Sequence, residues 1–157
     1  MQKITPFLWF DGNAEEAAEF YVSTFKNSKM GDVVRGGAGP GERARAMSVE
    51  FELEGQPFIA LNGGPHFKFN EAISLYVSCE TQAEVDALWA RLTADGGQPS
   101  QCGWLKDKFG LSWQIIPKTL PELLRDRDPA KAQRVMQAMM GMAKIDVEAL
   151  RRAHRGE

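Results

Sequence analysis

Apolar and polar residues follow the same order twice along this chain. An apolar run over residues 4–10 ends in a polar turn, and residues 13–25 then carry apolar side chains at helical spacing. The same plan returns in the run 73–79 and in a second helical segment that extends from Thr81 to paired glycines at 96 and 97. The pattern predicts two copies of one unit, each opening with a strand and a helix.

The two helical segments superpose with a constant offset. Placing Thr81 on Asn13 gives 81 − 13 = 68, and this offset also places Glu84 on Glu16. Thr81 and Asn13 are both residue types that cap helix N-termini, so each is expected to cap its own helix.

Strands are predicted after each helix. In the first half, residues 29–35 form an extended run, 47–53 alternate strictly between apolar and polar side chains, and 58–61 follow a Glu54-Gly55 turn that is typical of a hairpin. The alternation places Val49, Phe51 and Leu53 in the core, and predicts that Glu50, Glu52 and Glu54 form a solvated outer face.

The second half repeats this order with shorter strands, around Ser100, at 104–106 and at 112–116. Helical patterns then continue to the C-terminus, with Asp128 and Asp146 as expected caps. The predicted fold class is α+β, with tandem βαβββ units and a helical C-terminal extension. We expect one domain over 1–157, divided into a first unit at 1–65, a second unit at 70–117 and the extension at 118–157.

The middle helix of the extension carries a methionine-rich face. Met136, Met139, Met140 and Ala143 fall on one side of it. Flexible thioethers fill irregular gaps, so this face is expected to form a core or subunit contact.

Charge and composition argue against two classes of partner, nucleic acids and membranes. The net charge is −2, and Arg151, Arg152 and Arg155 interleave with acidic residues in a solvated helix end, which argues against nucleic acid as a partner. No apolar run approaches the roughly 20 residues of a membrane span, so no membrane partner is expected. Two cysteines and the lack of a leader pattern favour a cytoplasmic protein with free thiols.

Three segments resemble a known family. They are LWFDGNAEEAAEFY at 8–21, VEFELEGQPFIALNGGPHFKFNEAIS at 49–74 and CGWLKDKFGLSWQIIP at 102–117. They are similar to the PhnB-like branch of the vicinal oxygen chelate superfamily, which is catalogued as demethylubiquinone 3-methyltransferase and is related to glyoxalase I, extradiol dioxygenases and bleomycin resistance proteins. The resemblance implies two βαβββ units around a cleft and a homodimer.

The resemblance also locates the positions that hold a metal in metal-using relatives. Carried over to this chain, these positions are Pro6, Ala60, Ser74 and Gln114. None is a normal metal ligand, so we expect neither a metal nor another cofactor. Ser74 and Gln114 remain polar on apolar strands, where they bind a ligand or else satisfy each other or a buried water.

The methyltransferase name requires an S-adenosylmethionine site. Gly36 to Gly41 superficially resembles a glycine-rich nucleotide loop, but a helix must follow such a loop directly, and here a strand pattern follows. We expect this loop to be a mobile connection.

Three further groups offer candidate chemistry. Cys102 near Lys106 is either a reactive thiolate or a buried, inert thiol, and His66 is either a general base or a solvated loop histidine. Aromatic side chains of the loop between the halves and of the final hairpin are expected to wall an apolar pocket: Phe67, Phe69, Trp104 and Trp113.

The leading hypothesis is a metal-independent protein that binds a small molecule, whose identity the sequence leaves open. The residues expected to line its cleft are Asn62, Phe67, Ser74, Cys102, Trp104 and Gln114. One alternative is an enzyme of the same superfamily, a glyoxalase-type lyase or isomerase or a dioxygenase, or the methyltransferase of the family name. Another is a scaffold defined by its dimer surface.

Overall fold

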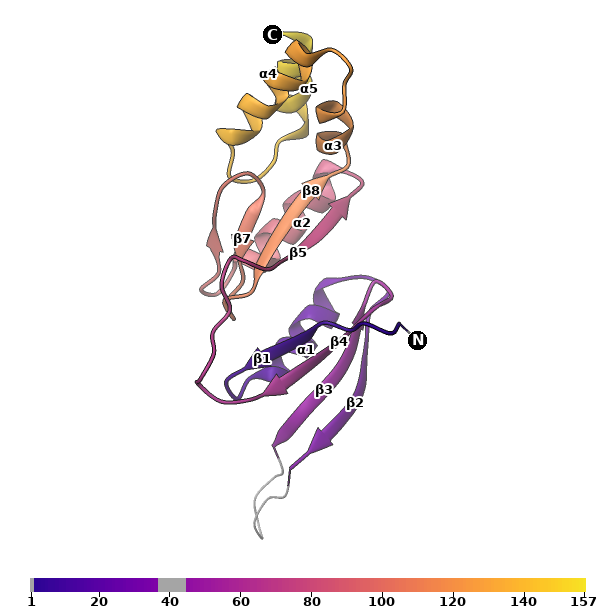
Figure 1. Ribbon diagram of the computed structural model, residues 1–157, viewed down its shortest axis with the longest axis vertical. Helices are drawn as coiled ribbons and strands as arrows, with labels where there is room; N and C mark the ends of the chain where they lie inside the picture. The colour runs from indigo at the N-terminus through magenta and orange to yellow at the C-terminus, as the bar shows by residue number, and fades with distance from the viewer. Residues whose placement is uncertain (1, 37–44) are drawn as a thin grey trace. The chain divides into compact units, whose positions relative to one another are not determined.

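A computed structural model describes residues 2–36 and 45–157 (Figure 1). The chain forms two units, Met1–Phe69 (unit 1) and Asn70–Glu157 (unit 2). Each contains one strand, one helix and three further strands in that order, as the repeated pattern predicts. The loop expected at Gly36 to Gly41 falls almost entirely outside the described residues.

Unit 1 is a four-stranded sheet with one helix against it. Its elements are β1 (Phe7–Phe10), α1 (Ala14–Thr24), β2 (Lys29–Arg35), β3 (Ala46–Leu53) and β4 (Gln56–Asn62). The strand order is β1-β4-β3-β2, and only the β1–β4 pair is parallel. The β3–β4 hairpin turns at Glu54 and Gly55, which both have positive φ, so the predicted tight turn is confirmed.

The core of unit 1 lies between α1 and one face of the sheet. Val49, Phe51 and Leu53 are buried there, as the alternation along β3 predicts. From the helix side, Ala17 and Ala18 are fully buried, and their small side chains leave room for the large rings of the sheet. Burial of each such ring stabilises the fold by about 1.5–3 kcal/mol.

The cap of α1 differs from the expectation. Asn13 makes no side-chain cap hydrogen bond, whereas the Oδ1 atom of Asn62 accepts a hydrogen bond of 2.9 Å from the backbone N–H of Ala14. The Asn62 Nδ2 atom also donates to the carbonyl of Ala46 at 2.9 Å. The helix is thus capped from β4, by a residue that is distant in sequence but adjacent in the fold.

Unit 2 repeats this arrangement. Its elements are β5 (Ser74–Cys79), α2 (Gln82–Thr93), β6 (Gln98–Pro99), β7 (Trp104–Lys106) and β8 (Ser112–Pro117), in the strand order β5-β8-β7-β6. The side chain of Thr81 accepts from the N–H of Glu84 at 3.2 Å, so this predicted cap is confirmed.

Three helices complete unit 2 after β8, in the orange to yellow part of Figure 1: α3 (Thr119–Leu124), α4 (Pro129–Met140) and α5 (Val147–Arg155). Asp128 and Asp146 cap α4 and α5 as predicted, with hydrogen bonds to Ala130 and Ala149. The buried core of this extension is formed by aliphatic residues of α3, α4, α5 and the end of β8: Ile116, Leu120, Val135, Ile145 and Leu150.

The methionine face of α4 is divided between core and solvent. Met139 packs against the core of the extension, whereas Met136 and Met140 are exposed. Ala143, expected on the same helical face, lies beyond the end of α4 at Met140. The helix stops there because Gly141 follows.

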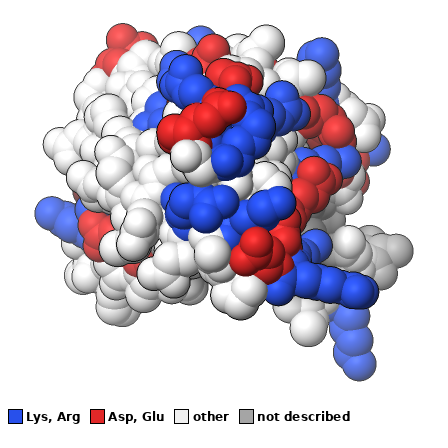
Figure 2. All heavy atoms as spheres, turned by 90° about the horizontal axis from the view of Figure 1, so that it is seen from above, with Lys and Arg blue, Asp and Glu red and all other residues white. Residues whose placement is uncertain are grey.

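Charged side chains of both signs interleave over the end of the molecule that carries the C-terminal helices (Figure 2). Arg155, for example, lies 3.5 Å from Glu148 and 3.0 Å from Glu157. No helix among the described residues is long and apolar enough to cross a membrane.

Candidate ligand site on the open sheet faces

Each sheet has one face that packs against the helix of its own unit and an opposite face, which we call the open face. On the first sheet, strand pairing places Phe7, Ile59 and Glu50 side by side on the open face. Phe7 and Glu50 are exposed there, whereas their chain neighbours Leu8 and Phe51 are buried beneath α1. Open-face positions are therefore free to contact a ligand while the opposite positions hold the core.

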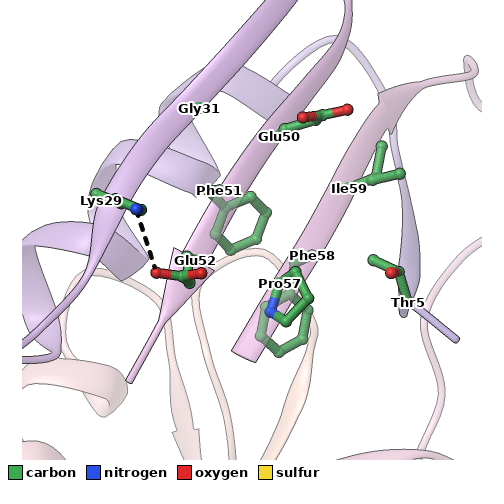
Figure 3. A pocket seen from close by; sticks show the side chains of 9 residues that line it. All are labelled: Thr5, Lys29, Gly31, Glu50, Phe51, Glu52, Pro57, Phe58 and Ile59. Atoms are coloured by element: carbon green, nitrogen blue, oxygen red, sulfur yellow. Dashed lines mark ion pairs between the residues drawn. The ribbon is translucent and has the colours of Figure 1, made fainter. Parts of the chain in front are cut away.

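A pocket of about 240 Å³ lies on the open face of the first sheet (Figure 3). Side chains with charged or hydroxyl groups reach it from β2, β3 and the segment before β1, among them Lys29, Glu50, Glu52 and Thr5. The Lys29 ammonium lies 3.7 Å from the Glu52 carboxylate, and no described residue pairs with Glu50. Pro57 and Ile59 of β4 supply apolar surface beside these groups.

Gly31 helps to form this hollow. A Cβ atom at this position would lie only 3.1 Å from the Cβ atom and the carbonyl oxygen of Glu50, tighter than ordinary contact. Glu50 and Glu52 lie opposite the apolar row of β3, as the alternation predicts. Glu50 and Glu54 are exposed to solvent there, as expected, and Glu50 and Glu52 also line the pocket.

The open face of the second sheet carries a polar row. The Nε2 atom of Gln114 donates a 2.9 Å hydrogen bond to Ser74 Oγ. Tyr76 on one side and Trp104 on the other are the direct cross-strand neighbours of Gln114. The structure thus brings Ser74, Trp104 and Gln114 together, and the Ser74 hydroxyl and the Gln114 amide satisfy each other.

A second pocket, of about 160 Å³, lies beside this row. Lys106 and Ser112, which are paired across β7 and β8, line it together with Trp104. The Lys106 ammonium forms an ion pair with the Glu71 carboxylate. The hydrogen bond that Lys106 donates within this pair is the main reason why the pKa of the Glu71 carboxyl lies below its usual range. Ser112 is buried, and its Oγ atom has no hydrogen-bond partner among the described residues.

The remaining predicted ligand residues lie elsewhere. The Asn62 side chain is engaged in the α1 cap and the Ala46 contact described above. Phe67 is exposed in the loop after β4, where its ring meets Trp9 edge-on with the centroids 4.9 Å apart. Cys102 lies in the turn before β7, where its N–H donates to the carbonyl of Met142 at 2.8 Å. None of the three lines either pocket.

The other candidate groups are either exposed in a loop or buried in a core. His66 is exposed in its loop. Trp113 is buried in the core of unit 2, and Phe69 packs edge-on against Phe10, so neither forms part of the two pockets. Burial raises the pKa of the Cys79 thiol to about 12, which keeps it protonated and unreactive at neutral pH.

The sequence pattern of the 3-demethylubiquinone-9 3-methyltransferase family matches residues 2–116. The chain belongs to this family. A solved structure bearing the family name, the PhnB protein from Bacillus cereus, is 38% identical, with a TM-score of 0.67, and the match covers 74% of this chain and 99% of that one. No curated protein matches the chain.

Two other solved structures are similar to the chain at lower identity. Protein PA1353 from Pseudomonas aeruginosa is 20% identical, with a TM-score of 0.61, over 74% of this chain and 98% of that one. A glyoxalase/bleomycin resistance protein from Albidiferax ferrireducens T118 is 15% identical, with a TM-score of 0.48, over 74% and 99% of the two chains. The C-terminal helices lie beyond the residues that the family pattern matches.

Strand pairing corrects the positions carried over for metal ligands in unit 1. The pair Phe7–Ile59 joins β1 to β4 in the first sheet, and the pair Tyr76–Gln114 occupies the matching place between β5 and β8 in the second. Residue numbers therefore differ by 76 − 7 = 69 between β1 and β5, and by 114 − 59 = 55 between β4 and β8. The counterpart of Ser74 is then residue 74 − 69, Thr5, and that of Gln114 is Ile59. Pro6 and Ala60 were each assigned one residue away, and Ala60 is buried on the helix-covered face.

The corrected set does not fit a divalent metal site. Thr5 and Ser74 offer hydroxyls, Gln114 an amide and Ile59 no donor, whereas protein sites for divalent transition metals are built mainly from imidazole, thiolate and carboxylate ligands. Among the described residues, no group of three or more His, Cys, Asp and Glu side chains is arranged to hold a metal. We therefore derive no chemistry through a metal for this family member.

Sequence reasoning missed Lys106, Ser112 and Glu71 as a group. In the sequence, Lys106 stands out only as a neighbour of Cys102, and Ser112 only as the start of a strand. A period-two register along β7 and β8 places both on the face of Gln114, so the signal was present once the pairing was known.

Proposed function

We propose that this protein binds a small organic molecule on the open faces of its sheets, without a metal. The observation that carries the proposal is the pocket of about 240 Å³ on the first sheet, where charged and apolar side chains converge on one hollow. Ligand sites combine mostly apolar walls with a few placed polar groups, and Ile59 and Pro57 beside Glu50 and Thr5 supply this combination.

The size of the hollow limits the ligand. A volume of about 240 Å³ corresponds to roughly eight water molecules at ~30 Å³ each. A small metabolite, or one part of a larger molecule, fits this space. The polar row of Ser74 and Gln114 in unit 2 offers a second place where hydrogen bonds orient a ligand.

Binding is favoured over methyl transfer, which the name of the family suggests. A nucleotide-type cofactor such as S-adenosylmethionine is commonly held at a free helix N-terminus that follows a strand in a parallel sheet. Here the sheets are mixed and four-stranded, and side chains already cap the N-termini of α1 and α2. No described feature supports a cofactor of that kind.

We also propose that the protein is a homodimer. Phe7, Val34 and Tyr76 stand on the open faces with more than half of their surface exposed. A second copy that covers part of this apolar surface would stabilise both chains. Light scattering after size-exclusion chromatography should give about 35 kDa, twice 17.5 kDa. A monomeric mass at micromolar concentration would contradict this proposal.

A thermal-shift screen tests the binding proposal. Purified protein is heated with each member of a metabolite library, and compounds that raise the melting temperature are titrated against Ile59→Trp, which fills the first pocket. Leu61→Trp is the matched control, because Leu61 lies on the same face of β4 but does not line the pocket. We expect Ile59→Trp to abolish the shift and Leu61→Trp to retain it. A library without hits would overturn the proposal, and hits that both variants retain would show that the ligand does not bind in the first pocket.

A further inference from the structure

The second pocket contains an unusual unsatisfied group. Ser112 is 1% exposed, and its hydroxyl lacks a hydrogen-bond partner among the described residues. Leaving such a group unpaired destabilises the folded protein, so buried hydroxyls are nearly always satisfied by protein, water or ligand. Ser112 lines the second pocket, and its hydroxyl is covered in the free protein, so a ligand reaches it only by displacing the side chains over it.

A positively charged side chain lines the same pocket. Lys106 is the direct cross-strand neighbour of Ser112, and it is held on its other side by pairing with Gln98. Directly opposed residues have Cβ atoms about 4.5–5.5 Å apart, so the Lys106 and Ser112 side chains start from neighbouring positions on the pocket wall. The ring of Trp104, on the same face, provides a flat apolar surface next to them.

The present partner of Lys106 is less firmly held. Glu71 lies outside any helix or strand, in the turn before β5, and 63% of its side chain is exposed against 37% for Lys106. An ion pair exposed to this extent is screened by solvent and contributes little to stability. A carboxylate from outside the chain therefore competes with Glu71 at little cost.

We propose that this pocket binds the carboxylate of a small organic acid, which takes the place of Glu71 beside Lys106. The incoming group displaces Glu71 from Lys106 and accepts a hydrogen bond from Ser112, while a flat apolar part of the ligand lies against Trp104. The volume of about 160 Å³ suits an acid of roughly ten non-hydrogen atoms. This inference rests on the proposed function, since it names the ligand class for one of the two open faces.

The experiment is an NMR titration of the isotope-labelled protein with benzoate, a flat carboxylate of suitable size, and with benzamide, its neutral isostere. Benzoate is expected to shift the backbone amide signals of Lys106 and Ser112, and benzamide to bind at least about tenfold more weakly, because charge-assisted hydrogen bonds are much the stronger kind. Equal binding of the two compounds, or benzoate shifts centred on other lysines, would overturn the proposal.

Two substitutions in the ion pair should act in opposite directions. Glu71→Gln removes the internal competitor and should tighten benzoate binding about two- to fivefold. Lys106→Gln removes the cation and should weaken it about tenfold. The matched control is Glu80→Gln, which breaks the Lys118–Glu80 ion pair outside the pocket and should leave the affinity unchanged. Weaker or unchanged binding by Glu71→Gln would show that Glu71 does not occupy the ligand position.

Ser112→Ala separates binding from folding. This variant removes a hydroxyl that has no partner, so its melting temperature should not fall, while its benzoate affinity should fall about three- to tenfold. Unchanged affinity, or a lowered melting temperature that indicates a structural water, would count against the proposal. If library compounds still bind at Ile59 while benzoate fails these tests, the inference falls and the proposed function stands. If neither probe binds, both fall.

Discussion

At the scale of single residues, Asp107 is a buried acid that accepts hydrogen bonds from several donors. This carboxylate is buried, and one of its oxygens accepts hydrogen bonds from the N–H groups of Phe109 and Leu111, at 2.8 and 3.1 Å. Its other oxygen accepts from Trp113 Nε1 at 2.8 Å. The three donors replace the water that a buried charge loses, and they fix the turn that joins β7 to β8. The positions of Lys106 and Ser112 depend on this turn.

Removing the acceptor should therefore destabilise unit 2. Asp107→Ala leaves three donors without their acceptor, and we expect the free energy of unfolding to fall by about 3 kcal/mol or more. Asp107→Asn retains one carbonyl oxygen for the two backbone N–H groups and should lose less than half as much. Urea denaturation followed by tryptophan fluorescence measures both. A loss below 1 kcal/mol for the alanine variant would contradict this account.

Cys79 predicts a dependence on alkaline pH. Burial raises the pKa of its thiol from 9.0 to about 12, so the folded chain retains the proton at pH values where the unfolded chain releases it. The contribution of this group to stability is complete below pH 9 and declines as the pH rises from 9 towards 12.

The measurement is the melting temperature of the wild type and of Cys79→Ala between pH 7 and 11. The wild type should lose more stability above pH 9 than the variant does, because only the wild type has a thiol to ionise on unfolding. Parallel curves would show that Cys79 does not titrate between the two states. Iodoacetamide should meanwhile label the half-buried Cys102 before the buried Cys79.

At the scale of elements, α1 and its cap show how a long-range contact replaces a local one. Asn62, at the end of β4, satisfies the free N–H of Ala14, whereas Asn13 makes no such bond. Asn62→Ala should therefore lower the free energy of unfolding by about 1–2 kcal/mol, the usual cost of a lost cap together with a lost hydrogen bond. Asn13→Ala is the control and should change it by less than 0.5 kcal/mol. Chemical denaturation measures both variants. A larger loss of stability for Asn13→Ala than for Asn62→Ala would contradict this account and indicate that Asn13 caps the helix.

The β3–β4 hairpin and the helix caps show which features the sequence specifies by itself. The β3–β4 hairpin was predictable because Glu54-Gly55 and the alternation on either side are local signals, and the Thr81 cap was predictable because donor and acceptor are three residues apart. The cap at Asn62 and the pocket beside Glu50 depend on strands that meet only after folding. Sequence spacing alone could not identify them.

The misplaced residues in unit 1 have a related cause. The two helices begin at Ala14 and Gln82 and obey the predicted offset of 68, but the turn before α2 is one residue shorter than the turn before α1. A difference of one residue moves a strand position to the other face of its sheet. Aligning by the helices therefore assigned Ser74 to Pro6 rather than to Thr5. Ser74 and Gln114 were found together because both lie in unit 2, where no offset was needed.

At the scale of the whole molecule, two units with one plan carry different chemistry at matching places. Glu52 pairs with Pro57 in unit 1 as Lys106 pairs with Ser112 in unit 2. The pocket of unit 1 therefore has an additional carboxylate where that of unit 2 has a cation. The duplicated frame fixes the positions, and the side chains determine which ligand charge each open face favours.

The C-terminal helices add a further hydrophobic core to unit 2. They pack around Ile145, which is fully buried, and they lie beyond the matched family pattern. In the same region, a Cβ atom on Gly103 would come within 2.7 Å of Ile116 and 3.1 Å of Ile145, so the turn before β7 and the extension are closely fitted. The extension therefore supports the strand that carries Lys106.

Ile145→Ala tests this support. The cavity should lower the free energy of unfolding of the extension by about 2–5 kcal/mol, and hydrogen exchange of the α4, α5 and β7 amides should accelerate. Amides of the β1–β4 sheet should keep their protection, because unit 1 has its own core. Met140→Ala, at a site 63% exposed, is the control and should alter neither region. If β7 keeps full protection while α4 and α5 lose theirs, the helices are an independent appendage, and the geometry of the second pocket does not depend on them.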